Sequence, residues 1–312
     1  MSSQRIKIFA GTSHPALAQS ICDAIDLPLS KSEVVKFANE NLMVRILENV
    51  RGCDVFFVQT SAPPVNEALV ETLIAIDALK GASAARVTAV LPYLPYSRSD
   101  KKDQPRISIT ARLVADLLQT AGADRVLTMD LHAAQIQGFF HVPVDQLMGA
   151  PVLCDYLKTW DLSNTVLVAG DVGEAKDIGK FANALHLPVA IVDKRRYGND
   201  DRAVATNLIG DVVGKHAIIV DDEIATGGTV IEATNFLMSR GALSVKVVAT
   251  HGVLSGPAVE RINNSVVDRL IVTDTIPLRD KMSNKITVLS VAPLFANAIR
   301  RIHDGDSVSD LF

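Results

Sequence analysis

Residues 218–229 read Ile-Ile-Val-Asp-Asp-Glu-Ile-Ala-Thr-Gly-Gly-Thr, and this stretch decides the fold. A short apolar run ends in two aspartates, and a Thr-Gly-Gly-Thr turn then opens a helical pattern that extends to residue 239. The order predicts a buried parallel strand, a tight loop and a helix. The loop is then expected at the carboxyl end of the strand, where ligands bind in open α/β sheets.

The composition of this loop is that of a sugar-phosphate site. Gly227 and Gly228 allow backbone N–H groups to approach a phosphate, and the start of a helix favours an anion. Thr226 and Thr229 add hydroxyl donors, while the paired aspartates can accept hydrogen bonds from the vicinal hydroxyls of a sugar. A capped helix explains Thr-Gly-Gly-Thr by itself, but the apolar strand and the two aspartates favour a 5-phosphoribosyl group.

Outward from this stretch, short runs rich in Val and Ile alternate with longer helical patterns. The predicted strands are 6–10, 54–59, 86–91, 125–129, 165–169, 189–192, 217–220, 244–249, 270–273 and 285–289. The predicted helices include 67–80, 110–121, 228–239 and 292–302. This alternation predicts an α/β protein with mainly parallel sheets.

An internal echo predicts two copies of the α/β domain. Gly122 and Gly241 each follow a helix as a C-cap would, and each precedes a strand and then a histidine, His132 or His251. The chain has 312 residues, enough for two cores. Residues 1–149, which 303–312 could complete, are predicted to form an N-terminal domain, and 150–302 a C-terminal domain.

Composition argues against several classes of partner and location. The net charge of −4 gives no reason to expect nucleic acid or a membrane surface as a partner. No apolar run approaches the roughly 20 residues of a membrane span, and residues 1–7 lack a signal-peptide pattern. Three widely spaced cysteines without zinc spacing predict reduced thiols in a cytoplasmic protein.

Residues 191–197 read Ile-Val-Asp-Lys-Arg-Arg-Tyr and place three cations after a buried strand. A surface charge cluster is the ordinary explanation for such a tripeptide. Because the strand is buried, however, its carboxyl end should share one sheet edge with the loop after 217–220. Fixed cations at that edge would stabilise the charge that develops on phosphate oxygens in a transition state.

Further polar positions follow other predicted strands. His132 follows 125–129 and Asp171 follows 165–169. A structural role is the ordinary explanation for His132 alone, but an imidazole and a carboxylate can also hold Mg²⁺ whose other ligands are water and phosphate oxygens. Residues 96–106 lack apolar periodicity and are basic, which predicts a mobile loop. It is either a lid that excludes water from a triphosphate or a solvated loop.

Taken together, these segments resemble the class I ribose-phosphate diphosphokinases, or PRPP synthetases, over essentially the whole chain. Further ordered matches lie at 36–41, 50–55, 130–132, 250–258, 275–277 and 306–312. The resemblance implies two phosphoribosyltransferase-like domains, each a mainly parallel sheet flanked by helices. It also implies a kinase-type transferase of nucleotide biosynthesis. Its reaction would move the β,γ-diphosphate of Mg-ATP to the 1-hydroxyl of ribose 5-phosphate, giving phosphoribosyl diphosphate (PRPP) and AMP.

The resemblance further implies a role for particular positions. The implied catalytic residues are Lys194 and Arg196. The implied ATP-binding residues are Phe37, Asn39, Glu40, Asn41, Arg98, Ser99 and His132. The implied ribose 5-phosphate residues are Arg196, Asp221, Asp222, Ala225, Thr226, Gly227, Gly228 and Thr229. The implied Mg²⁺ ligands are His132 and Asp171, and a regulatory phosphate is expected near Arg51, Ser83, Arg106, Ser307 and Ser309.

The same resemblance implies a homo-oligomer, a hexamer of dimers, in which the adenine-binding segment crosses a subunit interface. Phosphate is the expected activator and ADP the expected inhibitor. The chain departs from the family pattern by Asn41 for glutamate, Ala225 for aspartate, Glu174 for glycine, Ser99 for glutamine and Asn49 for serine. Two alternatives stay open: a phosphoribosyltransferase, which uses PRPP, and a non-catalytic regulatory subunit derived from a synthetase.

Overall fold

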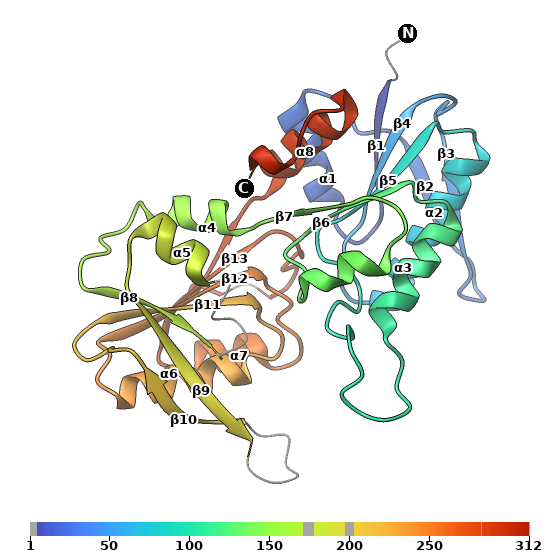
Figure 1. The fold of residues 1–312 in the computed structure, drawn as a ribbon. Coiled ribbons are helices and arrows are strands. Elements are labelled where there is room, and N and C mark those ends of the chain that lie inside the picture. Colours follow the sequence, from blue (N-terminus) through green and yellow to red (C-terminus); the bar gives the residue numbers. More distant parts are fainter. Residues whose placement is uncertain (1–4, 171–177, 197–202, 282, 312) are drawn as a thin grey trace. The chain divides into compact units, whose positions relative to one another are not determined.

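By its contacts the chain divides into two units, each built around its own sheet (Figure 1). The first unit comprises Met1–Met148, Thr275–Pro277 and Val291–Phe312, and the second Gly149–Asp274 and Leu278–Ser290. The computed structural model describes residues 5–170, 178–196, 203–281 and 283–311, and of these only the backbone for 194–196 and 203–206.

A five-stranded sheet in the order β1-β4-β5-β6-β7 forms the centre of the first unit, and every neighbouring pair is parallel. The strands are β1 (Ile6–Ala10), β4 (Asp54–Val58), β5 (Arg86–Leu91), β6 (Arg125–Met129) and β7 (Val144–Leu147). The helices are α1 (Pro15–Ile25), α2 (Val65–Gly81), α3 (Thr110–Ala121), α8 (Ala292–Asp304) and the 3₁₀ turns η1 (Ala134–Phe139) and η3 (Ser309–Leu311).

Alternate residues of these strands enter two separate cores, because successive side chains of a strand point to opposite faces of the sheet. Phe9 and Phe57 pack with residues of α2 and α3, whereas Ile8 and Phe56 pack with residues of α1 and α8. Helices therefore cover both faces, as a parallel sheet requires (Figure 1).

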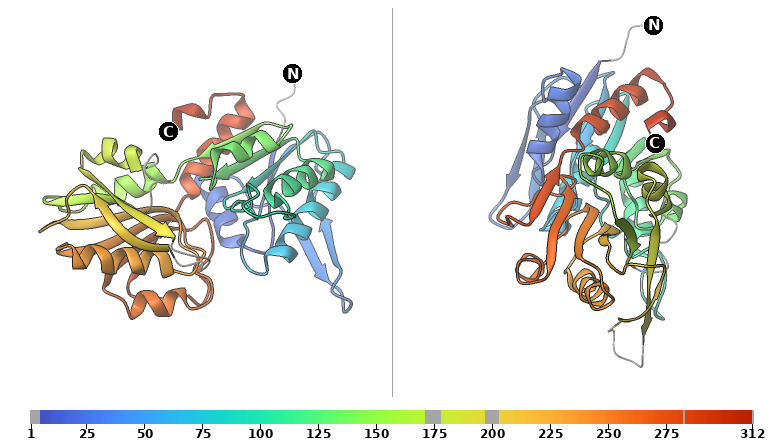
Figure 2. Two further views of the ribbon diagram at one scale, coloured as in Figure 1. Left: turned by 60° about the horizontal axis from the view of Figure 1, so that its bottom comes forward. Right: turned by 90° about the vertical axis from the view of Figure 1, so that its left-hand side faces the viewer.

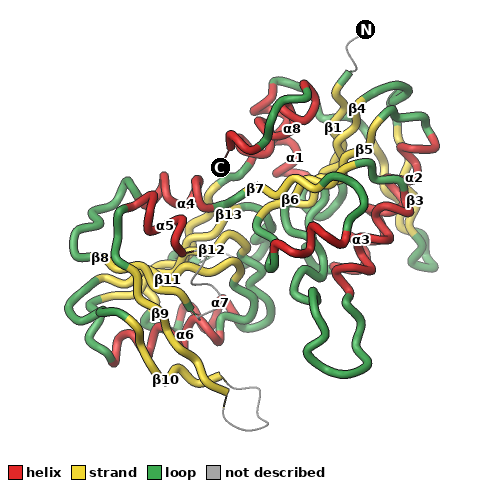
Figure 3. The backbone as a smooth tube through the Cα atoms, in the orientation of Figure 1, coloured by secondary structure: helices red, strands yellow, loops and turns green. Residues whose placement is uncertain are grey.

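The second unit has seven strands in the order β10-β9-β8-β11-β12-β13-β14, parallel except for β10 (Figures 2 and 3). They are β8 (Thr165–Ala169), β9 (Val189–Arg196), β10 (Ala203–Ile209), β11 (His216–Glu223), β12 (Ser244–His251), β13 (Val267–Thr273) and β14 (Ile286–Leu289). One core contains α4 (Ala150–Leu157) and α5 (Ile178–Leu185), and the other contains α6 (Gly228–Ser239) and α7 (Ala258–Asn263).

The predicted fold class is confirmed: both units are α/β, with mainly parallel sheets flanked by helices. The strands predicted at 6–10, 86–91, 125–129 and 165–169 and the helices predicted at 110–121 and 228–239 have their predicted bounds. The predicted strands omitted β7, β10 and the antiparallel hairpin of β2 (Ser32–Lys36) and β3 (Leu42–Ile46). The hairpin strands are only partly buried and therefore lack a continuous apolar run.

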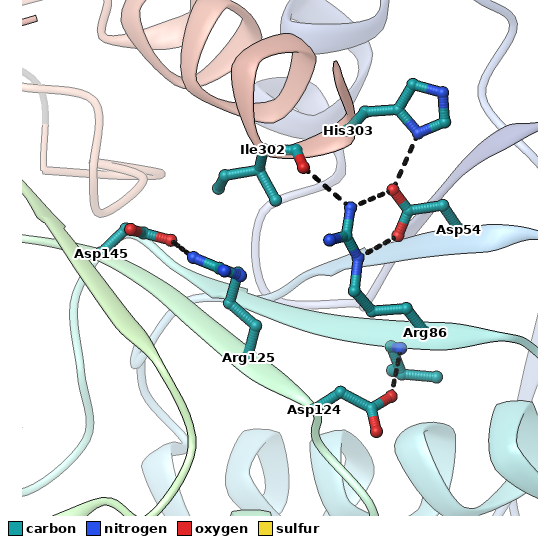
Figure 4. Close-up of polar contacts among 8 residues, drawn as sticks. Asp54, Arg86, Asp124, Arg125, Asp145, Ile302 and His303 are labelled. Atoms are coloured by element: carbon teal, nitrogen blue, oxygen red, sulfur yellow. Dashed lines mark hydrogen bonds and ion pairs between the residues drawn. The ribbon is translucent and has the colours of Figure 1, made fainter. Parts of the chain in front are cut away.

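Helix α8 lies in the first unit, which differs from the predicted assignment of 150–302 to the second domain. Its apolar side packs with α1 against the sheet. Figure 4 shows the polar contacts that accompany this packing: Arg86 Nη2 donates to the Ile302 carbonyl at 2.9 Å, and His303 Nδ1 lies 2.8 Å from Asp54 Oδ2. The Asp54 carboxylate is fully buried and also accepts from Arg86, as a buried charge requires.

Candidate active site

The carboxyl ends of β9, β8 and β11 form one edge of the second sheet. Both Ile191 of β9 and Val220 of β11 lie opposite Ala169 of β8, so the three strands are level there. Beyond that level β9 continues to Arg196 and β11 continues to Glu223. The backbone of Lys194 and Arg196 and the loop after β11 therefore extend beyond the end of β8 at the same edge, as predicted. The cations do not follow the strand, however: β9 continues through them because their backbone pairs with β10.

Residues 225–229 form the loop between β11 and α6, which we call the cradle. Gly227 is the N-cap of α6 and has a left-handed φ of +74°, and no side chain caps the helix. The first N–H groups of α6 thus have no intrahelical acceptor, and such groups bind anions readily. Gly227 is buried, while Thr226 and Thr229 are exposed at the mouth of the loop.

The strand that leads into the cradle ends in carboxylates. Asp221 and Asp222 are half-buried, and Glu223 is 9% exposed. The Glu223 N–H donates weakly to Asp221 Oδ1 at 3.4 Å, which ties the first carboxylate to the strand end. Carboxylate acceptors therefore lie immediately before the N–H donors of the cradle.

A second segment of the same unit, residues 251–261, supports the cradle from behind. It combines the last residue of β12, a turn and most of α7. Three backbone hydrogen bonds join it to the residues that open the cradle: Ile224 N to His251 O at 2.9 Å, Leu254 N to Ile224 O at 2.9 Å and Ser255 N to Ala225 O at 2.8 Å. The conformation of the cradle therefore depends on a segment that comes later in the chain, after α6 and most of β12.

Sequence reasoning missed one side chain of this support. Arg261 Nη1 donates to the carbonyl oxygen of Thr226 at 3.0 Å. The segment 250–258 resembles the family pattern, but Arg261 lies beyond it on a short helix whose sequence gives no indication of a role. Only the fold brings it to the cradle.

In the first unit, predicted nucleotide positions follow two adjacent strand ends. Because β5 and β6 are parallel neighbours, the connection 92–109 and the segment that follows β6 start from the same edge of the sheet, and His132 lies in that segment. Arg98 and His132 are exposed. Ser99 is tied to α3, since its Oγ accepts from the Thr110 N–H at 3.3 Å. The structure therefore gathers three of the predicted ATP positions at one edge.

The remaining predicted ATP positions lie on the tip of the β2–β3 hairpin, which projects from the first unit (Figure 2). Phe37 N donates to the Asn41 carbonyl at 2.9 Å, and Asn41 N donates to Asn39 Oδ1 at 3.2 Å. Glu40 takes a left-handed φ of +67° in this turn. The ring of Phe37 is 48% exposed, so the tip presents an aromatic surface to solvent.

The predicted regulatory positions fall into two sets. Arg51 and Ser83 precede β4 and β5, and the Gly52 N–H donates to the Ser83 carbonyl at 2.9 Å, so these turns adjoin. Ser307 and Ser309 follow α8, whose end is bound to the same edge through Asp54 and Arg86 (Figure 4). Arg106 lies in the connection after β5, which starts from the opposite edge of the sheet. Within one chain it is therefore separate from the other four predicted regulatory positions.

The structure covers four of the positions named from the sequence incompletely or not at all. Asp171 and the unusual Glu174 lie outside the described residues, and Lys194 and Arg196 are described by their backbone. Within the described ranges, no group of three His, Cys, Asp or Glu side chains is arranged to hold a metal ion.

Two of the three cysteines have thiols of low reactivity near neutral pH. Cys22, Cys53 and Cys154 are buried free thiols. Burial raises the pKa of both the Cys22 and the Cys154 thiol to about 11, so little thiolate is present near neutral pH. Among the helices of the described part of the chain, none has the length and apolar character to span a membrane.

Fold and site together define a class, an α/β protein with a glycine-containing loop that follows two aspartates at the carboxyl edge of a parallel sheet. Residues 6–122 match the family model described as the N-terminal domain of ribose phosphate pyrophosphokinase, and residues 199–312 match the phosphoribosyl synthetase-associated domain. This chain belongs to the ribose-phosphate pyrophosphokinase family, a family of diphosphotransferases, and the family predicted from the sequence is confirmed.

Individual relatives match over nearly the whole chain. A ribose-phosphate pyrophosphokinase of Clostridium perfringens is 51% identical over 314 residues, covering 99% of this chain and 98% of the relative. One from Caldanaerobacter subterraneus is 51% identical, covering 98% of each. The crystal structure of a phosphoribosylpyrophosphate synthetase from Mycobacterium smegmatis matches with a TM-score of 0.92 and 44% identity over 97% of this chain and 100% of that one.

Proposed function

We propose that this chain transfers the β,γ-diphosphate of ATP to the 1-hydroxyl of ribose 5-phosphate, giving PRPP and AMP. The observation that carries the proposal is the common sheet edge from which the cradle and the cationic end of β9 both extend. Members of the family to which the chain belongs carry this activity in their names.

In the proposed reaction the free N–H groups of the cradle bind the 5-phosphate, and Asp221 and Asp222 accept hydrogen bonds from ring hydroxyls. The 1-hydroxyl then attacks the β-phosphorus of ATP in line. A new O–P bond forms, the bond to the α-phosphate oxygen breaks, AMP leaves, and the proton of the hydroxyl is released to solvent. Lys194 and Arg196 neutralise charge on the transferred group and the leaving oxygen. No covalent enzyme intermediate is required, because positioning and charge stabilisation supply most of the rate.

We further propose that the ATP is used as its Mg²⁺ complex, with His132 and Asp171 as protein ligands. One imidazole and one carboxylate make a small donor set. Such a set fits an ion that keeps several waters and takes its remaining ligands from nucleotide phosphates. The ion would neutralise phosphate charge and help to align the reacting groups.

The exposed hairpin tip supports a proposal about assembly. The ring of Phe37 is half exposed, and such a ring suits a base that stacks on it. The hairpin projects away from the five-stranded sheet of the first unit (Figure 2). We propose that the tip serves the nucleotide site of a neighbouring subunit in a homo-oligomer, a hexamer of dimers. Phosphate and ADP are the proposed effectors at the edge that carries Arg51, Ser83, Ser307 and Ser309. Free, buried cysteines are compatible with the proposed cytoplasmic location.

One assay tests the central proposal. Purified protein is incubated with Mg²⁺, ATP and ribose 5-phosphate, with and without inorganic phosphate, and AMP and ADP are separated by chromatography. We expect AMP and PRPP in equal amounts and loss of both when EDTA is added. Release of ADP would contradict diphosphoryl transfer. Activity with PRPP and a purine or pyrimidine base without ATP would indicate a phosphoribosyltransferase, and AMP only after addition of a catalytic partner would indicate a regulatory subunit.

A further inference from the structure

We propose that Arg261 is a positioning residue of the cradle: it sets the orientation of the peptide between Thr226 and Gly227 and thereby prepares the loop for the 5-phosphate. The proposal rests on the proposed function and adds to it a residue outside the loop. Its side chain contacts the backbone of the cradle, and the proposed effect on substrate binding passes through that backbone.

The geometry of one peptide carries the proposal. Arg261 Nη1 lies 3.0 Å from the Thr226 carbonyl oxygen, so this carbonyl points towards α7. In a trans peptide the N–H of the next residue points in the opposite direction. The hydrogen bond from Arg261 therefore holds the Gly227 N–H away from α7. A carbonyl turned to the other side would present an acceptor, which repels a phosphate, where a donor is needed.

The cradle needs such a constraint because glycine does not supply one. Gly227 has a φ of +74° and is followed by Gly228, and glycine adopts positive and negative φ values with similar ease. Two successive glycines therefore leave the peptide free to reorient in the absence of outside contacts. Arg261 supplies a directional contact at this point, and its charged donor gives a stronger hydrogen bond than a neutral one.

The support behind the cradle is itself well anchored. Ala258 of α7 is fully buried, and its Cα lies 3.7 Å from the point where a Gly227 side chain would begin. Farther along the support, Lys281 Nζ donates to the Val253 carbonyl at 2.9 Å. Burial lowers the pKa of Lys281, in keeping with a lysine that is partly withdrawn from water. Arg261 thus binds a carbonyl of the cradle, and Lys281 binds a carbonyl of the support. Helix α7, which carries Arg261, is held in place by the buried Ala258.

Arg261 can be replaced without disturbing the core. Its side chain is exposed, and alanine is favourable in a helix, so Arg261→Ala should fold normally. Arg261→Lys keeps the charge and one donor group. Arg269→Ala is the matched control, because Arg269 is an exposed arginine of the same unit near the start of β13, away from the carboxyl edge.

The measurement is binding of ribose 5-phosphate by calorimetry, together with KM and kcat for both substrates. For Arg261→Ala we expect roughly tenfold weaker binding of ribose 5-phosphate, the scale of one hydrogen bond to a charged group at an exposed site. KM for ATP and the melting temperature should stay near those of the wild type. Arg261→Lys should recover part of the affinity, and Arg269→Ala should match the wild type.

Hydrogen exchange of the unliganded protein provides a readout that does not depend on activity. The amides of Ile224 and Ile231, which donate to His251 O and Gly227 O at the two ends of the cradle, should exchange faster in Arg261→Ala than in the wild type, and at the wild-type rate in Arg269→Ala. Unchanged exchange and unchanged ribose 5-phosphate affinity in Arg261→Ala would overturn the inference. Equal losses for ATP and ribose 5-phosphate with a lower melting temperature would assign Arg261 a merely structural role. A wild-type protein that forms no AMP would instead contradict the proposed function, while the exchange result would still decide the role of Arg261.

Discussion

Two strand–loop–helix–strand segments of this chain follow the same path and differ in their loops. In the first unit β5, α3 and β6 follow one another, and in the second unit β11, α6 and β12 do so, with parallel pairing of the two strands in each case. A left-handed glycine follows each helix: Gly122, with φ +109°, is the C-cap of α3, and Gly241, with φ +92°, follows the C-cap Arg240 of α6. The internal echo in the sequence thus corresponds to a repeated local structure.

The loops at the carboxyl edge differ greatly in length and support. Between β11 and α6 only residues 224–227 intervene, and the support 251–261 binds them on one side. Between β5 and α3 the chain runs from 92 to 109, and its described anchors include Ser99 on Thr110. One scaffold therefore presents a short, braced loop suited to a fixed phosphate and a long, basic loop suited to a larger and more variable ligand.

The largest effect is expected at the cationic strand end beside the braced loop. Lys194→Ala should lower kcat by more than about a hundredfold, the scale of losing one donor that acts in the transition state. Steady-state formation of AMP measures it. Lys215→Ala, at the opposite edge of the same sheet where Lys215 pairs with Asp211, should remain near wild type. Near-normal turnover of Lys194→Ala would contradict a catalytic role for the cationic end of β9.

A smaller effect is expected when the braced loop itself is strained. Gly227→Ala places a Cβ at a φ of +74°, which costs about 1–2 kcal/mol in the left-handed region. If the loop shifts to relieve this strain, affinity for ribose 5-phosphate should fall about tenfold, as calorimetry would detect. Gly179→Ala in α5 is the control, since no atom lies within 4 Å of its added carbon. Full affinity in Gly227→Ala would indicate that the left-handed turn is unnecessary for binding.

The long loop should respond differently. Arg98→Ala removes an exposed cation from the 92–109 connection and should raise KM for ATP about fivefold while leaving ribose 5-phosphate affinity unchanged, because one exposed charged contact contributes about 1 kcal/mol. Initial rates at varied ATP measure this. Arg112→Ala on α3, where Arg112 pairs with Asp116, controls for loss of a surface charge. An equal rise in KM for ATP and KM for ribose 5-phosphate would contradict the proposal that the two loops serve different substrates.

The smallest effect concerns the anchor of the long loop. Ser99→Ala removes the acceptor for the Thr110 N–H at the start of α3 and should reduce stability by about 1 kcal/mol, as loss of a helix cap does. Thermal unfolding should shift by about 2–4 °C, while KM for ATP changes only slightly. Ser108→Ala, at an exposed neighbour, should leave the unfolding temperature unchanged. A large rise in KM for ATP would instead assign Ser99 a direct role in nucleotide binding.

The local pattern was enough to predict the elements that carry the site. The run 218–229 specified strand, loop and helix because buried parallel strands are continuously apolar and because the two glycines end one element before the next begins. The same reasoning placed the cations of β9 at the cradle's edge, since parallel strands end at one side of a sheet. It failed for the β2–β3 hairpin, whose half-exposed strands carry a weaker pattern.

By itself, then, the sequence determined the fold class, the repeated strand–loop–helix pattern and the residue types at the cradle, because these depend on interactions between near neighbours. Only the tertiary structure decided that α8 packs in the first unit and that Arg261 reaches Thr226. An amphipathic helix reveals that one of its faces is buried but not which surface covers it. A contact between residues 35 positions apart likewise depends on how β12 and α7 fold back onto the loop.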